Sequence, residues 1–382
     1  MIEILHKKDC CGCGACAQSC PVNCITMVSD TEGFLYPRVD KDKCINCNKC
    51  NRVCPVQNAD NNNNDQPEAY VAMSRDKTRL ESSSGGLFYL LAKEILSKGG
   101  AVAGAAFDDS WLVRHDIADN PDDLSGLLRS KYMQSNINKV YTEVKKLLDE
   151  DKSVLFTGTG CQVSGLKAYL GKPYDNLYTI DVLCHGAPSP QVWRCYLNEL
   201  EEKYHSHVTD VNFRNKVSGW KDYSISISFE NGETYSEVYK DNSYMKLFLS
   251  NYILRPSCHS CKFKSLNRCS DLTLGDAWGI GSIMPEFDDD GGTSLILAHT
   301  NKGKKLIEQI REDLIISTVN ADDVLPPNAD SRKSVDMPYG RAYAFHVFTR
   351  KKSIPKMQEA TAYNYTNRIM RKIIPNKDEG FR

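Results

Sequence analysis

The stretch that decides the first part of the fold is CCGCGACAQSCP, which runs from Cys10 to Pro21. The same spacing, C-x2-C-x2-C-x3-C-P, returns as CINCNKCNRVCP from Cys44 to Pro55. Three thiolates two residues apart surround one cubic [4Fe-4S] cluster, and the fourth thiolate, three residues on, ligates a second cluster. The spacing therefore predicts two clusters, with Cys10, Cys13, Cys16 and Cys54 as ligands of the first and Cys20, Cys44, Cys47 and Cys50 as ligands of the second.

A pair of zinc sites and a chance cysteine-rich loop are the alternatives for these cysteines. Zinc sites usually combine two C-x2-C pairs or include histidine, and the sequence has no histidine between Cys10 and Cys54. The pattern is therefore that of a bacterial-type two-cluster ferredoxin domain over residues 1–57. Cys11 and Cys24 stand outside the pattern and are interpreted as bystanders, although Cys11 could compete with Cys10.

The rest of the chain divides into regions that differ in composition and in the pattern of apolar residues. Residues 58–68 are polar and low in complexity, which predicts a linker. From Ala69 onward, apolar strand-like runs alternate with amphipathic helical runs, which predicts an α/β domain over residues 69–300. We expect residues 301–382 to form a helical extension. Short strands are predicted at 25–28, 33–37, 70–73, 101–107, 154–158 and 177–183, and helices at 87–96, 140–148 and 163–170.

One hairpin signal bears on the type of sheet. Residues 223–235 alternate around Asn231-Gly232, a pair that favours a tight β-turn. Because a hairpin adds antiparallel strands, we expect a mixed sheet in the larger domain and not a purely parallel one.

Composition excludes some functions. The 382 residues include 48 basic and 49 acidic side chains, a net charge of −1, which argues against a nucleic-acid-binding surface. The sequence has no apolar run of the roughly 20 residues that a membrane helix needs, so no membrane insertion is expected. The N-terminus lacks a signal-peptide pattern, so the expected location is the cytoplasm. The sixteen cysteines are then expected to bind metal, because thiols stay reduced there.

A third cluster is predicted in the larger domain. Cys258 and Cys261 form a C-x2-C pair, Cys269 follows soon after, and Cys161 and Cys184 stand where strands are expected to end. Four thiolates complete a [4Fe-4S] site. A single structural zinc ion or a reduced cysteine pair are the alternatives.

Two turns have the composition of phosphate-binding sites. Ser82-Ser83-Ser84-Gly85-Gly86 precedes a helix, and we expect it to cap that helix and to expose free amides. Gly158-Thr159-Gly160-Cys161-Gln162 follows a strand in the same manner. Neither is a Walker loop or a G-x-G-x-x-G fingerprint, and the alternative for each is a simple capped turn.

The order of the motifs carries a resemblance to a known family. The ferredoxin pattern is followed by SSGG (83–86), RSKY (129–132), GTGCQ (158–162), CHGAPS (184–189), RPSC (255–258) with Cys261, and SDLTLGDAWG (270–279). This order resembles the coenzyme F-420 hydrogenase/dehydrogenase beta-subunit family, in the form that carries an N-terminal two-cluster domain. A proline is expected at the third position of GTGCQ, where this chain has Gly160.

The resemblance implies FAD beside the third [4Fe-4S] cluster. Carried over by position, the flavin-binding residues would be Ser84, Gly85, Gly86, Lys131, Gly158 and Thr159. The ligands of the third cluster would be Cys161, Cys184, Cys258 and Cys261, with Cys269 as the substitute if Cys161 faces the flavin instead. Lys131 would be the catalytic residue that stabilises the anionic reduced flavin; a surface lysine is its alternative. Asp181 and Asp276 would bind flavin hydroxyl groups or cap turns.

The predicted function is therefore that of an iron–sulfur flavoprotein oxidoreductase. It would pass electrons between the ferredoxin-type clusters and FAD, and on to a two-electron carrier or substrate. Its partner would be a redox protein or a small electron carrier. The alternatives are a non-catalytic electron-transfer subunit that serves a partner enzyme and a structural iron–sulfur protein.

Overall fold

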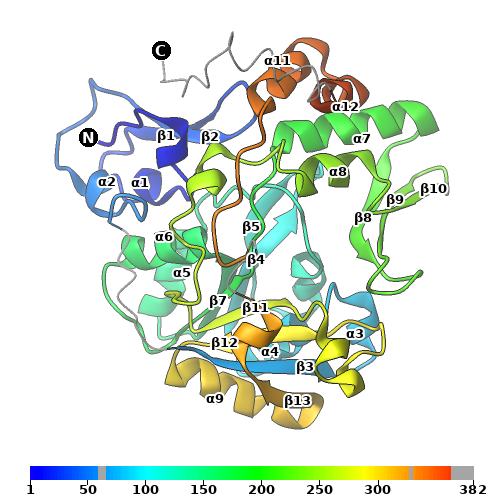
Figure 1. Cartoon of the computed structure of the whole chain (residues 1–382). Coiled ribbons are helices and arrows are strands. Elements are labelled where there is room, and N and C mark those ends of the chain that lie inside the picture. The colour runs from blue at the N-terminus through cyan, green and yellow to red at the C-terminus, as the bar shows by residue number, and fades with distance from the viewer. Residues whose placement is uncertain (59–65, 327–328, 330, 363–382) are drawn as a thin grey trace.

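The computed structural model describes residues 1–58, 66–326, 329 and 331–362 (Figure 1). A small N-terminal module packs beside a larger body that is built around an eight-stranded sheet. The predicted fold class, a ferredoxin-like module followed by an α/β domain with a mixed sheet, is confirmed.

The module consists of two very short helices and one hairpin. Its elements are α1 (Ala15–Gln18), β1 (Ile25–Ser29), β2 (Leu35–Val39) and α2 (Lys49–Arg52). The strands predicted at 25–28 and 33–37 are confirmed as β1 and β2, and they pair antiparallel as a hairpin. Each helix begins after a residue with positive φ, Gly14 at 73° and Asn48 at 59°. This sharp turn places the third cysteine of each stretch, Cys16 or Cys50, on the helix that follows.

The main sheet is mixed. Its strand order is β13-β3-β12-β11-β7-β6-β4-β5, and β4, β6, β7 and β11 are parallel neighbours. The four remaining strands pair antiparallel. The strands are β3 (Glu68–Ser74), β4 (Ala101–Phe107), β5 (Val113–Ala118), β6 (Val154–Thr159), β7 (Leu177–Val182), β11 (Leu272–Asp276), β12 (Ser294–Ala298) and β13 (Leu314–Val319).

The main sheet is mixed for a reason other than the predicted one, because the hairpin at 223–235 is not part of it. The hairpin around Asn231-Gly232 exists as β9 (Ser224–Phe229) and β10 (Thr234–Val238). Together with β8 (Val208–Asn215), it forms a separate three-stranded sheet outside the main one. The antiparallel strands of the main sheet lie instead at its two sides.

Helices cover both faces of the main sheet. Adjacent residues of β4 and β6 point to opposite faces, so Val102 and Leu155 pack in one core while Ala103 and Phe156 pack in another. The first core is closed by α4 (Leu87–Ser97) and α9 (Asn301–Gln309), and the second by α5 (Val140–Asp149) and α6 (Gly160–Leu170). Because β4, β6, β7 and β11 run parallel, their carboxyl ends lie at one edge of the sheet, here called the carboxyl edge. Open α/β sheets bind their ligands at this edge.

A further core joins the module to the larger body. Phe34 and Tyr36 of the module pack with Trp193 in a cluster built from β8, β9 and four helices. Glu32 of the module forms a buried ion pair with Arg341, whose Nη2 lies 2.7 Å from Glu32 Oε2. The helices of this core are α7 (Pro190–Tyr204), α8 (Ser243–Leu249), α11 (Arg341–Lys351) and α12 (Ile354–Ala362). The module is thus held by shared packing.

The C-terminal region contributes more than helices. Residues 301–362, expected as a helical extension, also provide β13, an edge strand of the main sheet, and the short helix α10 (Ala321–Val324). Most of the stretch predicted as a linker, residues 59–65, and the end of the chain after 362 lie outside the described residues. Across the described residues, no helix combines the length and apolar character needed to cross a bilayer.

Candidate iron–sulfur and flavin site

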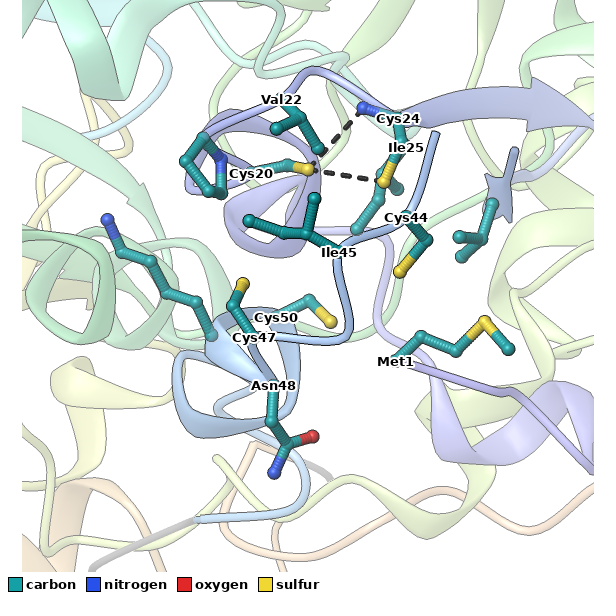
Figure 2. Close-up of a pocket in the computed structure, with 13 residues that line it drawn as sticks. Met1, Cys20, Val22, Cys24, Ile25, Cys44, Ile45, Cys47, Asn48 and Cys50 are labelled. Atoms are coloured by element: carbon teal, nitrogen blue, oxygen red, sulfur yellow. Dashed lines mark hydrogen bonds between the residues drawn. The ribbon is translucent and has the colours of Figure 1, made fainter. Parts of the chain in front are cut away.

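The cysteines predicted to hold the second cluster surround one cavity near the surface of the module (Figure 2). We call it the outer cavity; it is lined by Cys20, Cys24, Cys44, Cys47 and Cys50. Cys47 is exposed, whereas Cys20 and Cys50 are buried. The amide of Ile2 donates to Cys50 Sγ at 3.1 Å, and the amide of Cys24 donates to Cys20 Sγ at 3.4 Å. Such N–H donors stabilise a metal-bound thiolate.

Cys24, predicted as a bystander from the spacing, also lies at the outer cavity. Its Sγ lies 3.4 Å from Cys20 Sγ, and its side chain faces the outer cavity (Figure 2). The spacing of the ligand motif did not indicate this position of Cys24, which directly precedes β1.

The four cysteines predicted for the first cluster lie deeper in the module. Cys10, Cys13, Cys16 and Cys54 are all buried. Burial, and then the nearby charges of Cys10 and Cys54, raise the pKa of the Cys16 thiol. Buried thiolates repel one another unless a cation compensates them, and iron supplies that charge when a cluster binds. The donor set therefore fits a cluster.

A second cysteine-lined cavity, the inner cavity, lies between the module and the carboxyl edge. The structure places all four cysteines predicted for the third cluster around it, together with Cys11 of the module: Cys11, Cys161, Cys184, Cys258 and Cys261. These residues come from distant parts of the chain. Cys161 lies in the first turn of α6, Cys184 follows β7, and Cys258 lies in the turn Pro256–Ser260.

The sulfur atoms of the inner cavity also receive backbone donors. Ala187 N donates to Cys258 Sγ at 3.3 Å, and Phe263 N donates to Cys261 Sγ at 3.4 Å. The first turn of α6 adds its partial positive charge beside Cys161. In the described part of the chain, no group of three or more His, Cys, Asp or Glu side chains is arranged to hold a single metal ion.

Two cysteines lie differently with respect to this cavity from what the sequence suggested. Cys269, the predicted substitute ligand, is exposed and does not line the cavity; its carbonyl oxygen accepts a hydrogen bond from Lys167 Nζ. Cys11, the predicted bystander, lines it, and its thiol lies beside those of Cys13 and Cys161. Cys11 therefore lies between a predicted ligand of the first cluster and one of the third.

Five basic residues are among those that line the inner cavity: Lys8, Arg255, Lys262, Lys264 and Arg268. Arg255 is 1% exposed and joins the module to the body. Its guanidinium donates to the carbonyl oxygens of Cys10 at 2.8 Å and Leu35 at 2.9 Å, and to Gln134 Oε1 at 2.9 Å. A positive wall suits a cluster whose thiolate ligands carry negative charge.

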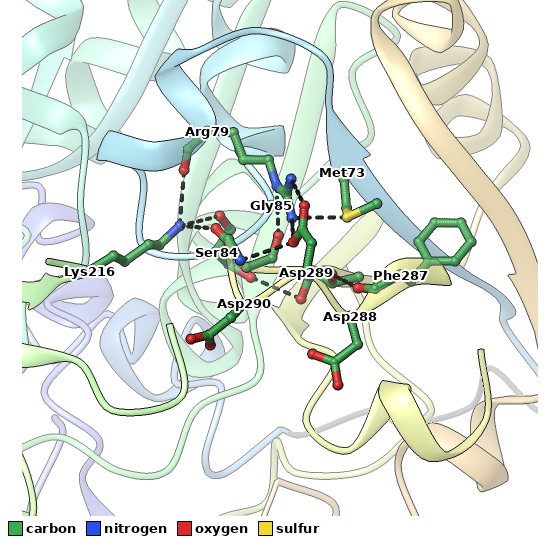
Figure 3. Close-up of polar contacts among 12 residues, drawn as sticks. Met73, Arg79, Ser84, Gly85, Lys216, Phe287, Asp288, Asp289 and Asp290 are labelled. Carbon is green, nitrogen blue, oxygen red and sulfur yellow. Dashed lines mark hydrogen bonds and ion pairs between the residues drawn. The ribbon is translucent and has the colours of Figure 1, made fainter. Parts of the chain in front are cut away.

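Two of the segments predicted to bind flavin, the serine–glycine loop at 83–86 and the RSKY segment at 129–132, lie beside each other. Ser130 N donates to Ser83 Oγ at 2.7 Å, which links the segment before Lys131 to the serine–glycine loop. Lys216 Nζ fixes the same loop from outside by donating to the carbonyl oxygens of Ser84 at 2.8 Å and Arg79 at 2.9 Å (Figure 3).

The serine–glycine loop differs in detail from its prediction. Helix α4 is capped by Gly86, at φ +87°, and not by a serine side chain. The amide of Gly85 is occupied, because it donates to Ser294 Oγ at 3.0 Å. A side chain at position 85 would meet Ala72 O at 2.5 Å, so Gly85 is required for packing. The expectation of free amides is therefore wrong for Gly85.

The GTGCQ turn connects β6 to α6. Thr159 caps the helix, and its amide donates to Gln162 Oε1 at 2.9 Å. Thr159 and Gly160 line the inner cavity. A Cβ atom at Gly160 would lie 3.0 Å from Asp181 Oδ2. Asp181 itself is buried in an ion pair with Arg268 at 3.0 Å, so its carboxylate serves the packing of this edge.

Lys131 lies beside the end of β4. Its Nζ donates to Leu128 O at 2.7 Å and sits 5.6 Å from the centre of the Phe107 ring. Burial, and to a smaller degree the charge of Arg129, lower the pKa of Lys131 to about 7. A lysine whose charge is lost near neutral pH is typical of a functional position and not of a solvated surface.

Sequence reasoning missed several residues of this region. Arg255 stands within the RPSC motif that carried the resemblance, yet its contacts to the module depend on the fold. Arg214 pairs with Asp276, the last residue of β11, at 3.0 Å. Nothing in the local sequence around Arg214 indicates this contact, because 62 positions separate the two residues.

Comparison with known proteins supports the assignment. Residues 151–324 match the family model for the C-terminal part of the coenzyme F420 hydrogenase/dehydrogenase beta subunit. Residues 9–58 and 36–81 match two 4Fe-4S dicluster domain families. No protein of curated function matches the chain.

One similar solved structure comes from a xenon-derivatization study of the F420-reducing [NiFe] hydrogenase complex of Methanosarcina barkeri. The sequence identity is 17% and the TM-score 0.46, over 82% of this chain and 95% of that one.

The family matches define an iron–sulfur electron-transfer protein of an oxidoreductase class. The resemblance predicted from the order of the motifs is confirmed, because residues 151–324 match the beta-subunit family model and the N-terminal residues match 4Fe-4S dicluster domains. The matched beta-subunit region contains Cys161, Cys184, Cys258 and Cys261.

Proposed function

We propose that the chain is an iron–sulfur flavoprotein oxidoreductase with three [4Fe-4S] clusters and one FAD. It exchanges electrons with a redox partner protein or a small carrier at the module, and with a two-electron carrier or substrate at the carboxyl edge. The observation that carries the proposal is the placement of the cysteine sets. They form a row from exposed Cys47, through the buried first set, to Cys11 and Cys161 at the inner cavity.

The residues at the carboxyl edge fit a flavin next to the inner cavity. The loop of Ser84 and Gly86 lies beside Lys131, and Thr159 lines the cavity itself. Bound FAD would supply the exchange between a hydride and single electrons. The contribution of Lys131 is a positive charge in a partly buried place, where charge acts more strongly than in water. Gly158 and Thr159 hold the turn that presents Cys161 to the same edge.

A relay subunit without its own flavin is the second candidate. One observation favours it: the Gly85 amide, expected to be free for a phosphate, is bonded to Ser294. In that case the clusters would serve a partner enzyme that carries the two-electron chemistry. None of the sixteen cysteines, all of which lie among the described residues, forms a disulfide, and either function suits the cytoplasm, where thiols stay reduced.

Purification without oxygen followed by iron, acid-labile sulfide and flavin analysis tests the proposal. We expect about twelve irons per chain, from three clusters, and one FAD. About eight irons and no flavin after reconstitution would contradict the oxidoreductase and leave only the ferredoxin-type module. About twelve irons without flavin would favour the relay subunit.

A further inference from the structure

A buried arginine near the carboxyl edge has hydrogen-bond donors without partners. The side chain of Arg214 is 3% exposed, and its Nη1 donates to Asp276 Oδ2 at 3.0 Å and to the Tyr132 hydroxyl at 3.2 Å. Its Nε and Nη2 are also buried, and among the described residues neither has a hydrogen-bond partner. Nε–H and Nη2–H lie on one side of a guanidinium and bind two oxygens of a carboxylate or phosphate in parallel.

The local fold fixes the direction of this side chain. The register of β8 against β9 is irregular between Asn212 and Asn215, and Asn212 Oδ1 accepts a hydrogen bond from Arg214 N at 2.9 Å. Such bulges redirect a side chain and are frequent beside functional sites. The guanidinium lies 4.0 Å from the centre of the Tyr223 ring, a cation–π contact that holds its plane. The unpartnered donors are therefore held in a fixed direction.

Charged groups of both signs surround Arg214. Lys216 and Arg79 lie nearby, while Asp276 and Asp289 supply the neighbouring carboxylates. Burial, and then the charges of Arg214 and Arg79, lower the pKa of Lys216 to about 8. Arg79 is already paired with Asp289 at 2.6 Å, and Asp288 and Asp290 lie in the same region (Figure 3), so the unpartnered donors of Arg214, and not a net charge, indicate the ligand.

Unpartnered buried donors need an explanation in any protein. A buried donor without a partner is destabilising, and a charged one more so. Native proteins keep few such groups, and a ligand or an ordered water usually satisfies them. The Nε1 atom of Trp220 is a further buried donor without a partner among the described residues, and its ring stacks on Trp278 at 4.2 Å. Trp278 in turn lies 5.2 Å from the Arg214 guanidinium, so these donors belong to one assembly.

We propose that Arg214, oriented by Asp276 and Tyr132, binds the paired anionic oxygens of a carboxylate or a phosphate beside the flavin site. The inference deepens the proposed function and rests on it. Two molecules could supply these oxygens: FAD, through its phosphates, or the two-electron carrier, through a phosphate or a carboxylate. Trp278, which lies 5.2 Å from the Arg214 guanidinium, is 46% exposed.

The test uses full-length protein with intact clusters. Arg214→Gln removes the charge and the paired donors, and Arg214→Lys keeps the charge alone. Arg311→Gln, in an exposed ion pair with Glu308, is the matched control. We would measure the Kd of FAD for flavin-depleted protein by fluorescence, and the Kd of inorganic phosphate and of acetate for FAD-loaded protein by calorimetry. Loss of a bidentate charged contact should weaken the affected ligand at least about tenfold in Arg214→Gln, with Arg214→Lys between it and the wild type.

The pattern of affinities shows whether FAD or the two-electron carrier supplies the anionic oxygens that Arg214 binds. A weaker FAD complex with unchanged phosphate and acetate binding assigns the oxygens to the flavin. Weaker phosphate or acetate binding with unchanged FAD binding assigns them to the carrier. Unchanged affinities for all three ligands would overturn the proposal and leave Arg214 a structural arginine.

Two further controls keep the result interpretable. If Arg214→Gln does not retain its iron, Tyr132→Phe replaces it; this variant removes only the hydroxyl that orients Arg214 and should give a smaller loss in the same direction. If the wild type binds no flavin, the proposed function fails, and phosphate titration of the flavin-free protein then tests Arg214 alone. Binding of phosphate that is lost in Arg214→Gln would support the anion site, and equal binding in both proteins would refute it.

Discussion

The outer and inner cavities are both lined by cysteines, yet they are built in opposite ways. The outer cavity takes its cysteines from the first 50 residues, within a module whose turns are set by local spacing. The inner cavity collects cysteines from positions 11 to 261, brought together by β6, β7 and the turn that carries Cys258. The ligands of a cluster can therefore be predicted from spacing when one short segment supplies them, whereas the ligand set of the inner cavity came from the family resemblance and spacing alone left it open.

The largest expected effect tests the outer cavity. Cys44→Ser should remove the outer cluster and about four of the irons, because a hydroxyl is a poor ligand for iron that prefers thiolates. Cys24→Ser is the matched control, since Cys24 lines the same cavity outside the ligand spacing. Iron analysis and low-temperature EPR of the reduced proteins compare them. Iron loss in Cys24→Ser with full iron in Cys44→Ser would reverse the ligand assignment.

The next largest effect tests whether Arg255 holds the N-terminal module against the larger body. Arg255→Ala leaves three buried acceptors without their donor, the carbonyl oxygens of Cys10 and Leu35 and the Gln134 side chain. We expect a loss of about 2–5 kcal/mol in the free energy of unfolding. Urea denaturation followed by circular dichroism measures it, and exposed Arg311→Ala should change stability by less than about 0.5 kcal/mol. Equal stability of both variants would show that the module is docked by other contacts.

A smaller effect concerns the flavin side of the inner cavity. Because burial lowers the pKa of Lys131 to about 7, its ammonium is present below pH 7 and is lost as the pH rises. If that charge stabilises reduced flavin, the flavin midpoint potential should fall more steeply between pH 6 and 8 in the wild type than in Lys131→Met. The pKa of neighbouring His115 is lowered to about 4, chiefly by burial, so this side chain stays neutral over that range. Exposed Lys146→Met serves as the control, and identical pH profiles in all three proteins would remove Lys131 from the flavin site.

The smallest expected effect is that of Cys11→Ser, which tests whether Cys11 is a cluster ligand or only a neighbour of the inner cavity. Cys11 lies beside Cys161 but outside the set carried over from the family. Cys11→Ser should therefore keep all of its iron and change only the EPR line shape. Loss of about four irons would make Cys11 a cluster ligand.

Much of this arrangement was predictable from the sequence, and the exceptions have physical causes. The two ligand sets of the module follow from spacing, and the strands and helices around GTGCQ follow from apolar periodicity. The separate sheet of β8, β9 and β10 was not predictable, because a hairpin signal does not say which sheet a hairpin joins. The occupied amide of Gly85 and the contacts of Arg214 and Arg255 were also missed. These depend on partners that lie far away in sequence.

The central claim is that the inner cavity holds a third cluster of its own, and the iron content of a double variant tests it most directly. Cys258→Ser/Cys261→Ser, purified without oxygen, should keep about eight irons where the wild type holds about twelve. Cys269→Ser, whose side chain does not line the cavity, should match the wild type. Equal iron in the double variant and the wild type would contradict a third cluster at this site.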